Sequence, residues 1–204
     1  SRTVARGHPC GACREPPTVE ARFRRACQPA SPGAPRRAHT APVSFEETTT
    51  YSSTVDEVIA YLTDADRLVG RYEAMGDTNV EVLRCEPDGD DLVIELRRDV
   101  TIDLPGFAKK VLGETNTTIQ REHWAPVADD GSRRASYEIE AQGTPVRTIG
   151  TFLVEPDGNG ARHAVTGRME VKVPLIGGRL GSFLDGTARD RVKADFAHNR
   201  DTLG

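Results

Sequence analysis

The hydrophobic pattern of residues 79–173 limits the fold of this chain more than any other feature. Apolar side chains there alternate with polar ones, which is the period of a strand with one buried face. Turn residues divide the run into short stretches, and only the connection at 103–114 is long enough for a loop with one helical turn. We therefore predict six antiparallel strands, at 79 up to the turn at 87–90, 92–102, 115–124, 134–141, 146–155 and 162–173.

Helical patterns flank this run on both sides. Residues 44–51 predict one more strand, and two short helices follow it. The first helix begins at a capping sequence, formed by Ser53 with Asp56 or by Thr54 with Glu57, and the second runs from Asp64 to Gly76. After Pro174 a stripe at helical spacing predicts one long helix, with its apolar face at Ile176, Leu180, Phe183, Leu184, Ala188, Val192 and Phe196.

The order of these elements predicts an α+β fold: a strand, two short helices, a six-stranded antiparallel run and a long C-terminal helix packed on the sheet. This order resembles the START-like superfamily (SRPBCC, the helix-grip fold). Three segments, at 71–76, 104–113 and 173–178, also resemble an uncharacterised actinobacterial branch of unknown function. The resemblance implies a curved sheet around the terminal helix and a cavity for an apolar ligand. It implies no reaction, because a fold does not settle function.

The first 43 residues differ in composition from the rest of the chain. They hold eight arginines and two acids, a net charge of +6, whereas residues 44–204 have a net charge of -10. Such a segment buries too little apolar surface to offset its conformational entropy, so we predict a disordered tail at 1–43 and one domain at 44–204. Our hypothesis is that residues 1–42 are a mis-called upstream translation. Cys10 and Cys13 form one close pair, and structural zinc sites usually have two, so no metal site is predicted.

Composition and motifs exclude several classes of protein for the predicted domain. Its acidic balance argues against a nucleic-acid partner, and no apolar run reaches the roughly 18 residues of a membrane span. Glycine-rich phosphate loops, zinc-protease motifs and nucleophile elbows are absent, so we predict no cofactor and assign no catalytic residue. These patterns together favour a cytoplasmic protein, and they do not indicate an oligomeric state.

The alternation also predicts which side chains face the long helix. Where charged residues of a strand face water, the residues that alternate with them face inward. The candidate cavity residues are Tyr72, Leu96, Arg98, Glu122, Trp124, Tyr137, Ile139, Phe152, Met169, Leu180, Phe183 and Leu184. The alternative is an ordinary packed core, which has the same periodicity. Gly150 and Gly167 share the inward parity and are predicted to leave space beneath the helix.

Polar residues on the inward parity carry the most information. Arg98 and Glu122 are predicted to pair inside or to bind a polar group of a ligand, because an unpaired buried charge is costly. The alternative is an Arg98 that extends outward at a strand end. Tyr72 is predicted either at the cavity mouth or packed between helix and sheet. His163 lies beside a turn, so a surface or rim position is predicted for it.

The leading hypothesis is a non-enzymatic module that binds a lipid-like or polycyclic apolar ligand between the sheet and the helix. One alternative is an enzyme that resembles the polyketide cyclases and aromatases of the superfamily. For that enzyme Arg98, Glu122 and Tyr72 would form one cluster that moves protons. Another alternative is a protein-interaction domain that resembles the superfamily's chaperone activators, with a filled interior and an exposed apolar patch.

Overall fold

The computed structural model describes residues 45–173, 175 and 177–204. The predictions for the tail at 1–43, for Cys10 and Cys13, and for Pro174 and Ile176 lie outside the described residues. Among the described residues, no helix is both long and apolar enough to cross a membrane.

The first three elements match the sequence pattern closely. Strand β1 spans Phe45–Tyr51, helix α2 spans Val55–Thr63 and helix α3 spans Ala65–Ala74. Thr54 and Glu57 form the capping box of α2, and Asp64 caps α3 through the backbone N–H of Arg67. These side chains satisfy backbone donors that the first helical turn leaves unpaired.

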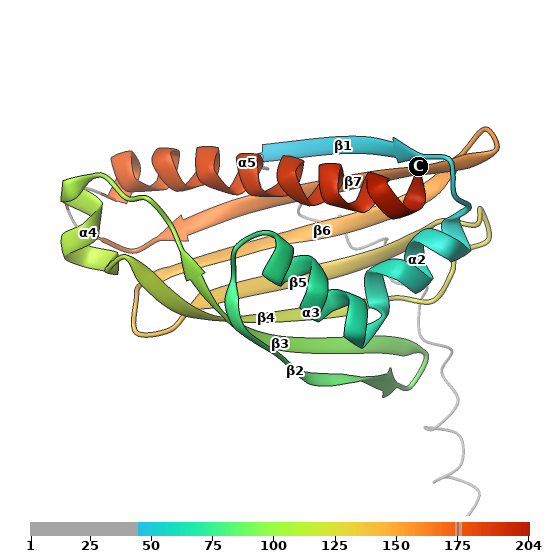
Figure 1. Ribbon diagram of the computed structural model, residues 1–204, viewed down its shortest axis with the longest axis horizontal. Helices are drawn as coiled ribbons and strands as arrows, with labels where there is room; N and C mark the ends of the chain where they lie inside the picture. Colours follow the sequence, from blue (N-terminus) through green and yellow to red (C-terminus); the bar gives the residue numbers. More distant parts are fainter. Residues whose placement is uncertain (1–44, 174, 176) are drawn as a thin grey trace, which may run out of the picture. The chain divides into compact units, whose positions relative to one another are not determined.

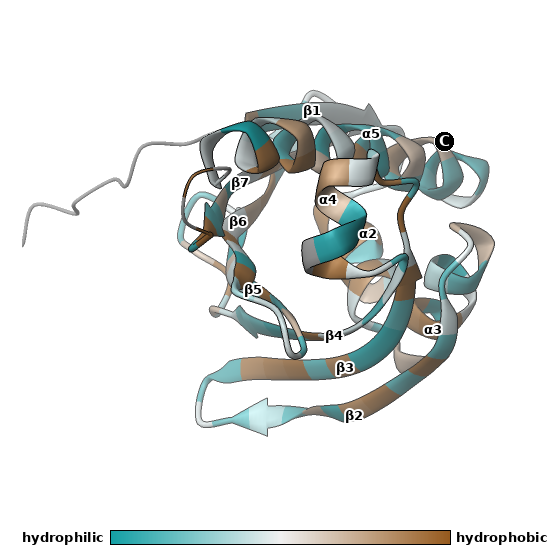
Figure 2. Cartoon of the chain, turned by 90° about the vertical axis from the view of Figure 1, so that its left-hand side faces the viewer, coloured by the Kyte–Doolittle hydropathy of each residue, from teal (hydrophilic) through white to brown (hydrophobic). Residues whose placement is uncertain are grey.

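Six further strands complete one antiparallel sheet, as predicted. They are β2 (Thr78–Asp88), β3 (Asp91–Thr101), β4 (Thr115–Trp124), β5 (Arg133–Ala141), β6 (Val146–Asp157) and β7 (Gly160–Val171). Each strand from β2 to β7 pairs with the next along the chain, and β1 pairs with β7, so the order is β1-β7-β6-β5-β4-β3-β2. The two edge strands are therefore β1 and β2, and the sheet curves between them (Figure 2).

Helix α5 (Gly177–Leu203) lies along the inner face of the sheet, beside β1 and β7 (Figure 1). Helix α4 (Gly106–Leu112) interrupts the run between β3 and β4, where the sequence predicts a loop with one helical turn. Together with α3, these helices stand on the concave side of the sheet (Figure 2). This architecture is a helix-grip fold, with the long helix held against a curved sheet.

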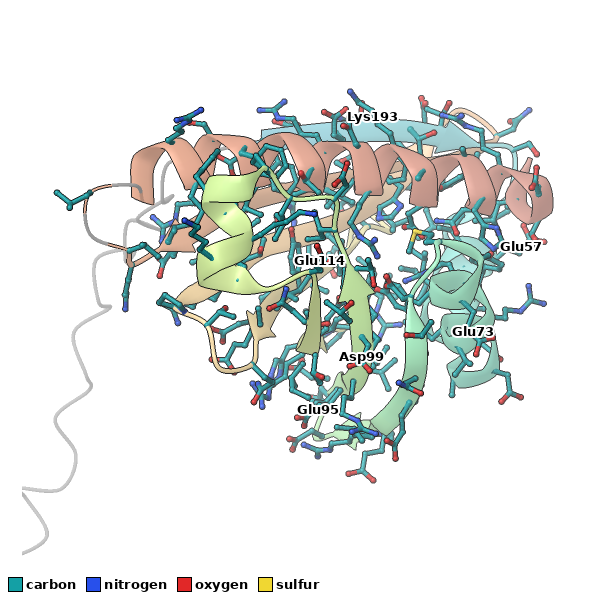
Figure 3. All side chains as sticks on the ribbon, turned by 60° about the vertical axis from the view of Figure 1, so that its left-hand side comes forward. Glu57, Glu73, Glu95, Asp99, Glu114 and Lys193 are labelled. Atoms are coloured by element: carbon teal, nitrogen blue, oxygen red, sulfur yellow. The ribbon has the colours of Figure 1, made fainter. Side chains whose placement is uncertain are left out.

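Two separate apolar clusters support the two ends of the inner face. One joins α2 and α3 to β3 and β4, through residues such as Leu68, Ile94 and Leu96. The other joins α4 to the first turns of α5, through Ala108, Leu112, Leu180 and Leu184, with Phe183 packed against it. The outer face carries exposed or half-buried charged side chains, such as Glu95 on β3 (Figure 3).

Candidate functional site

A cavity of about 200 Å³ lies between the inner face of the sheet and α5. Apolar cavities of roughly 150 Å³ already bind benzene, so this volume accommodates a small organic molecule. Most of its wall is apolar, and that part is formed by Phe45, Leu62, Met75, Val100, Ile102, Leu112, Trp124, Tyr137, Ile139, Ala141, Val146, Phe152, Val165, Met169, Leu184, Ala188 and Val192. The sequence alone left a filled core and a cavity as alternatives, and the structure contains a cavity.

Nine of the twelve candidate residues line this cavity: Tyr72, Arg98, Glu122, Trp124, Tyr137, Ile139, Phe152, Met169 and Leu184. Leu96, Leu180 and Phe183 do not. Leu96 is buried in the cluster beneath α2 and α3, whereas Leu180 and Phe183 pack against α4. Alternation identifies the face of a strand or helix, but it does not say which part of that face another element covers.

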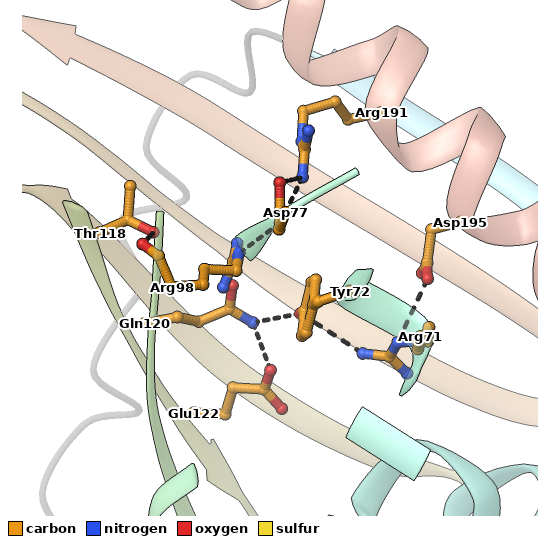
Figure 4. A network of polar contacts seen from close by, with 9 residues as sticks. All are labelled: Arg71, Tyr72, Asp77, Arg98, Thr118, Gln120, Glu122, Arg191 and Asp195. Carbon is orange, nitrogen blue, oxygen red and sulfur yellow. Dashed lines mark hydrogen bonds and ion pairs between the residues drawn. The ribbon is translucent and has the colours of Figure 1, made fainter. Parts of the chain in front are cut away.

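A network of polar side chains forms one wall of the cavity (Figure 4). Asp77, directly after the turn that ends α3, has only 1% of its side chain exposed. Its carboxylate accepts two hydrogen bonds from Arg191 of α5, at 2.8 and 2.7 Å, and lies 2.9 Å from Nε of Arg98. The predicted direct pair of Arg98 with Glu122 is therefore wrong, since Asp77 is the partner of Arg98. Both side chains are nevertheless buried, as the inward parity predicts.

Tyr72 and Glu122 are linked through Gln120, which lies between Arg98 and Glu122 on the inner face. The Gln120 amide donates to the Tyr72 hydroxyl at 2.9 Å and to one oxygen of Glu122. The Trp124 indole N–H donates to the other Glu122 oxygen at 2.8 Å. Burial raises the pKa of Glu122, although Arg71 and these hydrogen bonds act in the opposite direction. Of its two predicted positions, Tyr72 occupies the buried one between helix and sheet.

A second ion pair lies next to the hydrogen bonds that join Tyr72, Gln120 and Glu122. Nε of Arg71 in α3 is 3.2 Å from the carboxylate of Asp195 in α5, and an Nη donates weakly to the Tyr72 hydroxyl at 3.4 Å. The guanidinium of Arg98 stacks on the Tyr72 ring, 4.0 Å from its centroid. Helices α3 and α5 and strand β3 thus bring Arg71, Tyr72, Arg98 and Asp195 into one cluster.

His163 is buried, so the prediction of a surface or rim histidine is wrong. Its ring contacts Tyr51, Phe152 and Phe196, the last at 5.2 Å between ring centroids. Burial, with a smaller effect of the nearby Arg71, lowers the pKa of His163 to about 3. The turn that suggested exposure precedes His163 by only a few residues, but β1 and β6 flank His163 on both sides.

The two inward glycines have a different purpose from the one predicted. Tyr137, Gly150 and Gly167 are neighbours across β5, β6 and β7. A Cβ at Gly150 would lie 2.7 Å from the Tyr137 ring, and one at Gly167 would lie 2.6 Å from its hydroxyl. The Tyr137 ring therefore occupies the space over Gly150, and the Phe45 ring together with the Tyr137 hydroxyl occupies the space over Gly167. The hydroxyl donates to the carbonyl of Thr166 at 3.0 Å. The glycines permit this close approach and do not themselves enlarge the cavity.

Five polar members of the site were not among the candidates predicted from the sequence: Arg71, Asp77, Gln120, Arg191 and Asp195. Gln120 could have been predicted, because it has the same inward parity as Glu122. Arg191 and Asp195 are four residues apart and flank Val192 of the apolar stripe, so their spacing was a weaker indication that they face the sheet. Among the described residues, no group of three or more metal-ligating side chains comes together.

Comparisons with known proteins agree with this architecture. Residues 46–199 match the family described as "Protein of unknown function (DUF2505)", and the chain belongs to this family. Uncharacterised proteins of Mycobacterium tuberculosis and Mycobacterium bovis are 29% identical to it over 150 residues, which cover 68% of this chain and 84% of each relative.

Solved structures resemble the chain in fold. The protein TTHA0849 of Thermus thermophilus has a TM-score of 0.54 at 17% identity, over 78% of this chain and 94% of its own. A STAR-related lipid transfer protein of Xanthomonas axonopodis has a TM-score of 0.48 at 17% identity, over 75% and 83%. An aromatase/cyclase of a Streptomyces species has a TM-score of 0.44 at 20% identity, over 76% and 84%. At these identities the comparisons concern the fold alone.

Proposed function

We propose that this member of the DUF2505 family binds a small, largely apolar molecule in the cavity between the sheet and α5. The observation that carries the proposal is the cavity itself, about 200 Å³ in volume and lined mainly by aliphatic and aromatic side chains. Burial of a ligand there contributes roughly 25 cal/mol per Å² of apolar surface removed from water. The few polar groups at one wall then orient the ligand, as is usual for small-molecule sites.

The polar wall supports binding of an oriented ligand more than it supports stability of the empty protein. Arg71, Arg98, Gln120 and Glu122 are all buried, and removing such groups from water is costly. Apolar residues would fill these positions at a lower cost. A site that must hold a ligand in one orientation gives a physical reason for keeping them.

The test uses a neutral fluorescent probe, N-phenyl-1-naphthylamine, titrated into the full chain. Ala188 of α5 lines the cavity, and Ala188→Phe places a ring inside it. Ala194→Phe puts the same ring on the exposed side of the same helix and is the matched control. We expect the wild type and Ala194→Phe to bind the probe equally, and Ala188→Phe to bind at least ten-fold more weakly. Equal binding by all three, or no binding by the wild type, would contradict the proposal.

The arrangement around Glu122 favours one second candidate, an enzyme of the cyclase-like kind. Tyr72 and Glu122 are joined through Gln120, and burial raises the pKa of the Glu122 carboxyl, as is common for the general acids of enzymes. Organic extraction of the purified wild type and of Glu122→Gln separates the two functions. Identical extracted molecules favour binding alone, whereas a chemically different precursor trapped only in Glu122→Gln favours catalysis.

A further inference from the structure

We infer that the ligand of this cavity is amphipathic, with an apolar body and a carboxylate held by Arg71 and Arg98 beside the Tyr72 ring. The inference rests on the proposed function and goes beyond it by naming the class of ligand. Three observations carry it: the charges of the polar wall, the unpaired hydrogen-bond donors of its arginines, and the position of the apolar part of the cavity near α4.

The polar wall holds more positive than negative groups in ion pairs. Its three guanidiniums belong to Arg71, Arg98 and Arg191. Among the described residues, the carboxylates within ion-pair distance of them are Asp77 and Asp195.

The other two titratable groups of the wall form no ion pair with these arginines among the described residues. Glu122 accepts hydrogen bonds from two neutral donors, Gln120 and Trp124. Burial lowers the pKa of His163 to about 3, so its ring adds no positive charge near neutral pH. The carboxylate of a ligand would give Arg71 and Arg98 a further ion-pair partner inside the cavity. Inside a protein such a partner matters, because an unpaired buried charge is costly.

Two of these arginines also keep a donor without a partner. Nη1 of Arg71 and Nη1 of Arg98 are buried and have no hydrogen-bond acceptor among the described residues. Both side chains are more than nine-tenths buried and line the cavity. Their guanidiniums lie 5.1 and 4.0 Å from the centroid of the Tyr72 ring, so both face the same part of the wall (Figure 4). Guanidinium donors match carboxylate oxygens in geometry and charge.

The rest of the cavity suits the apolar body of such a molecule. Near α4 its wall is mainly apolar, with Ile102, Leu112, Val146 and Leu184, and polar members such as Asn116 and Thr148 carry no charge. A ligand with its carboxylate at Tyr72 would direct its hydrocarbon part toward α4. The cavity thus has one charged end and one end that is uncharged and mainly apolar.

The first experiment compares two probes of nearly equal shape that differ in charge. Binding of 2-naphthoate and of 2-naphthamide to the wild-type full chain is measured by isothermal titration calorimetry at pH 7.5. We expect 2-naphthoate to bind at least ten-fold more tightly. If 2-naphthamide binds as tightly or more tightly, the carboxylate inference is overturned while the proposed function stands. If neither probe binds and N-phenyl-1-naphthylamine does not bind either, both are overturned.

A pair of variants on β3 then locates the preference. Arg98→Met removes the buried guanidinium, whereas Arg97→Met removes its exposed neighbour, which pairs with Glu81 on the outer face. We expect Arg98→Met to lose most of the preference for 2-naphthoate and Arg97→Met to keep it. Circular dichroism checks that each variant is folded, and Arg71→Met replaces Arg98→Met if the latter is not. A preference that survives the loss of both Arg71 and Arg98 would contradict the site assignment.

Discussion

Two carboxylates of this molecule each form ion pairs with two arginines. One carboxylate lies at the inner face of the sheet, and the other lies on the outer face. Asp77 lies between Arg98 and Arg191 beside the cavity, with 1% of its side chain exposed. Glu170 lies between Arg147 and Arg168 on the outer face, with 22% exposed. The ion-pair distances are similar, from 2.6 to 2.9 Å. The two groups are therefore alike in chemistry and differ in their access to water.

This difference shows why the same arrangement has two roles. On the outer face, water screens the charges, and each ion pair contributes at most about 1 kcal/mol. Inside, the desolvation of three charged groups opposes their attraction, so the pairs add little net stability, but losing one partner is severe. The outer ion pairs of Arg147 link three neighbouring strands on the face exposed to water. The inner arginines are instead held at fixed positions in the wall of the cavity.

The largest expected effect is the loss of the inner carboxylate. Asp77→Ala leaves Arg98 without its ion-pair partner in a buried site, and we expect it to lower the free energy of unfolding by about 3–5 kcal/mol. Urea denaturation followed by circular dichroism measures this loss. The double variant Asp77→Ala/Arg98→Met should recover part of it, because it removes the buried charge as well. A loss below about 1 kcal/mol for Asp77→Ala would show that the inner cluster is solvated like the outer one.

An intermediate effect is expected from the buried histidine as the pH falls. Unfolded histidine binds a proton below its ordinary pKa of about 6.5, whereas His163 stays neutral down to about 3. Its stabilising contribution is thus present above pH 6.5 and is lost as the pH falls toward 3. Between pH 6.5 and 4.5 this loss amounts to about 2 kcal/mol.

Urea denaturation of the wild type and of His163→Leu at both pH values isolates this contribution. We expect the free energy of unfolding of the variant to fall by about 2 kcal/mol less than that of the wild type over this interval. His123→Leu, a change at an exposed histidine of β4, is the matched control. An identical pH dependence in the wild type and His163→Leu would contradict the buried, neutral state.

The smallest effect should come from the outer carboxylate. We expect Glu170→Ala to cost no more than about 1 kcal/mol, since its two arginines remain accessible to water and Arg147 keeps Glu138 as a partner. Salt sharpens the comparison with Asp77. The cost of Glu170→Ala should shrink between 0.05 and about 1 M sodium chloride, as measured by urea denaturation, whereas that of Asp77→Ala should change little. Equal salt sensitivity at both sites would remove the distinction between them.

Much of this architecture could be predicted from residue patterns. The alternation of apolar and polar residues predicted every strand from β2 to β7. The spacing of Val55, Val58, Ile59 and Leu62 predicted α2, and Thr54 was one of its predicted caps. These features are local, since they depend on neighbours a few residues away. The same alternation placed Arg98 and Glu122 on the inner face, where both are buried.

Partnerships within the site could not be predicted in this way. Asp77 and Arg191 are 114 residues apart, and nothing in their local sequence points from one to the other. His163 was misplaced because its neighbouring turn suggested exposure, while the strands that flank it come from distant segments. The space over Gly150 and Gly167 is filled by Tyr137 and Phe45, because the register of β1, β5, β6 and β7 aligns these four residues.

The sequence by itself determined the elements, their order and the inward or outward side of each strand, because hydrophobic periodicity and capping act over a single helical turn or a pair of residues. Only the tertiary structure decided that a cavity remains beneath α5 and that Arg98 pairs with Asp77. It also decided that Arg71 and Arg98 meet on one tyrosine ring. These features depend on how far a helix stands from a curved sheet and on which side chains meet across that distance, and periodicity carries no information on either.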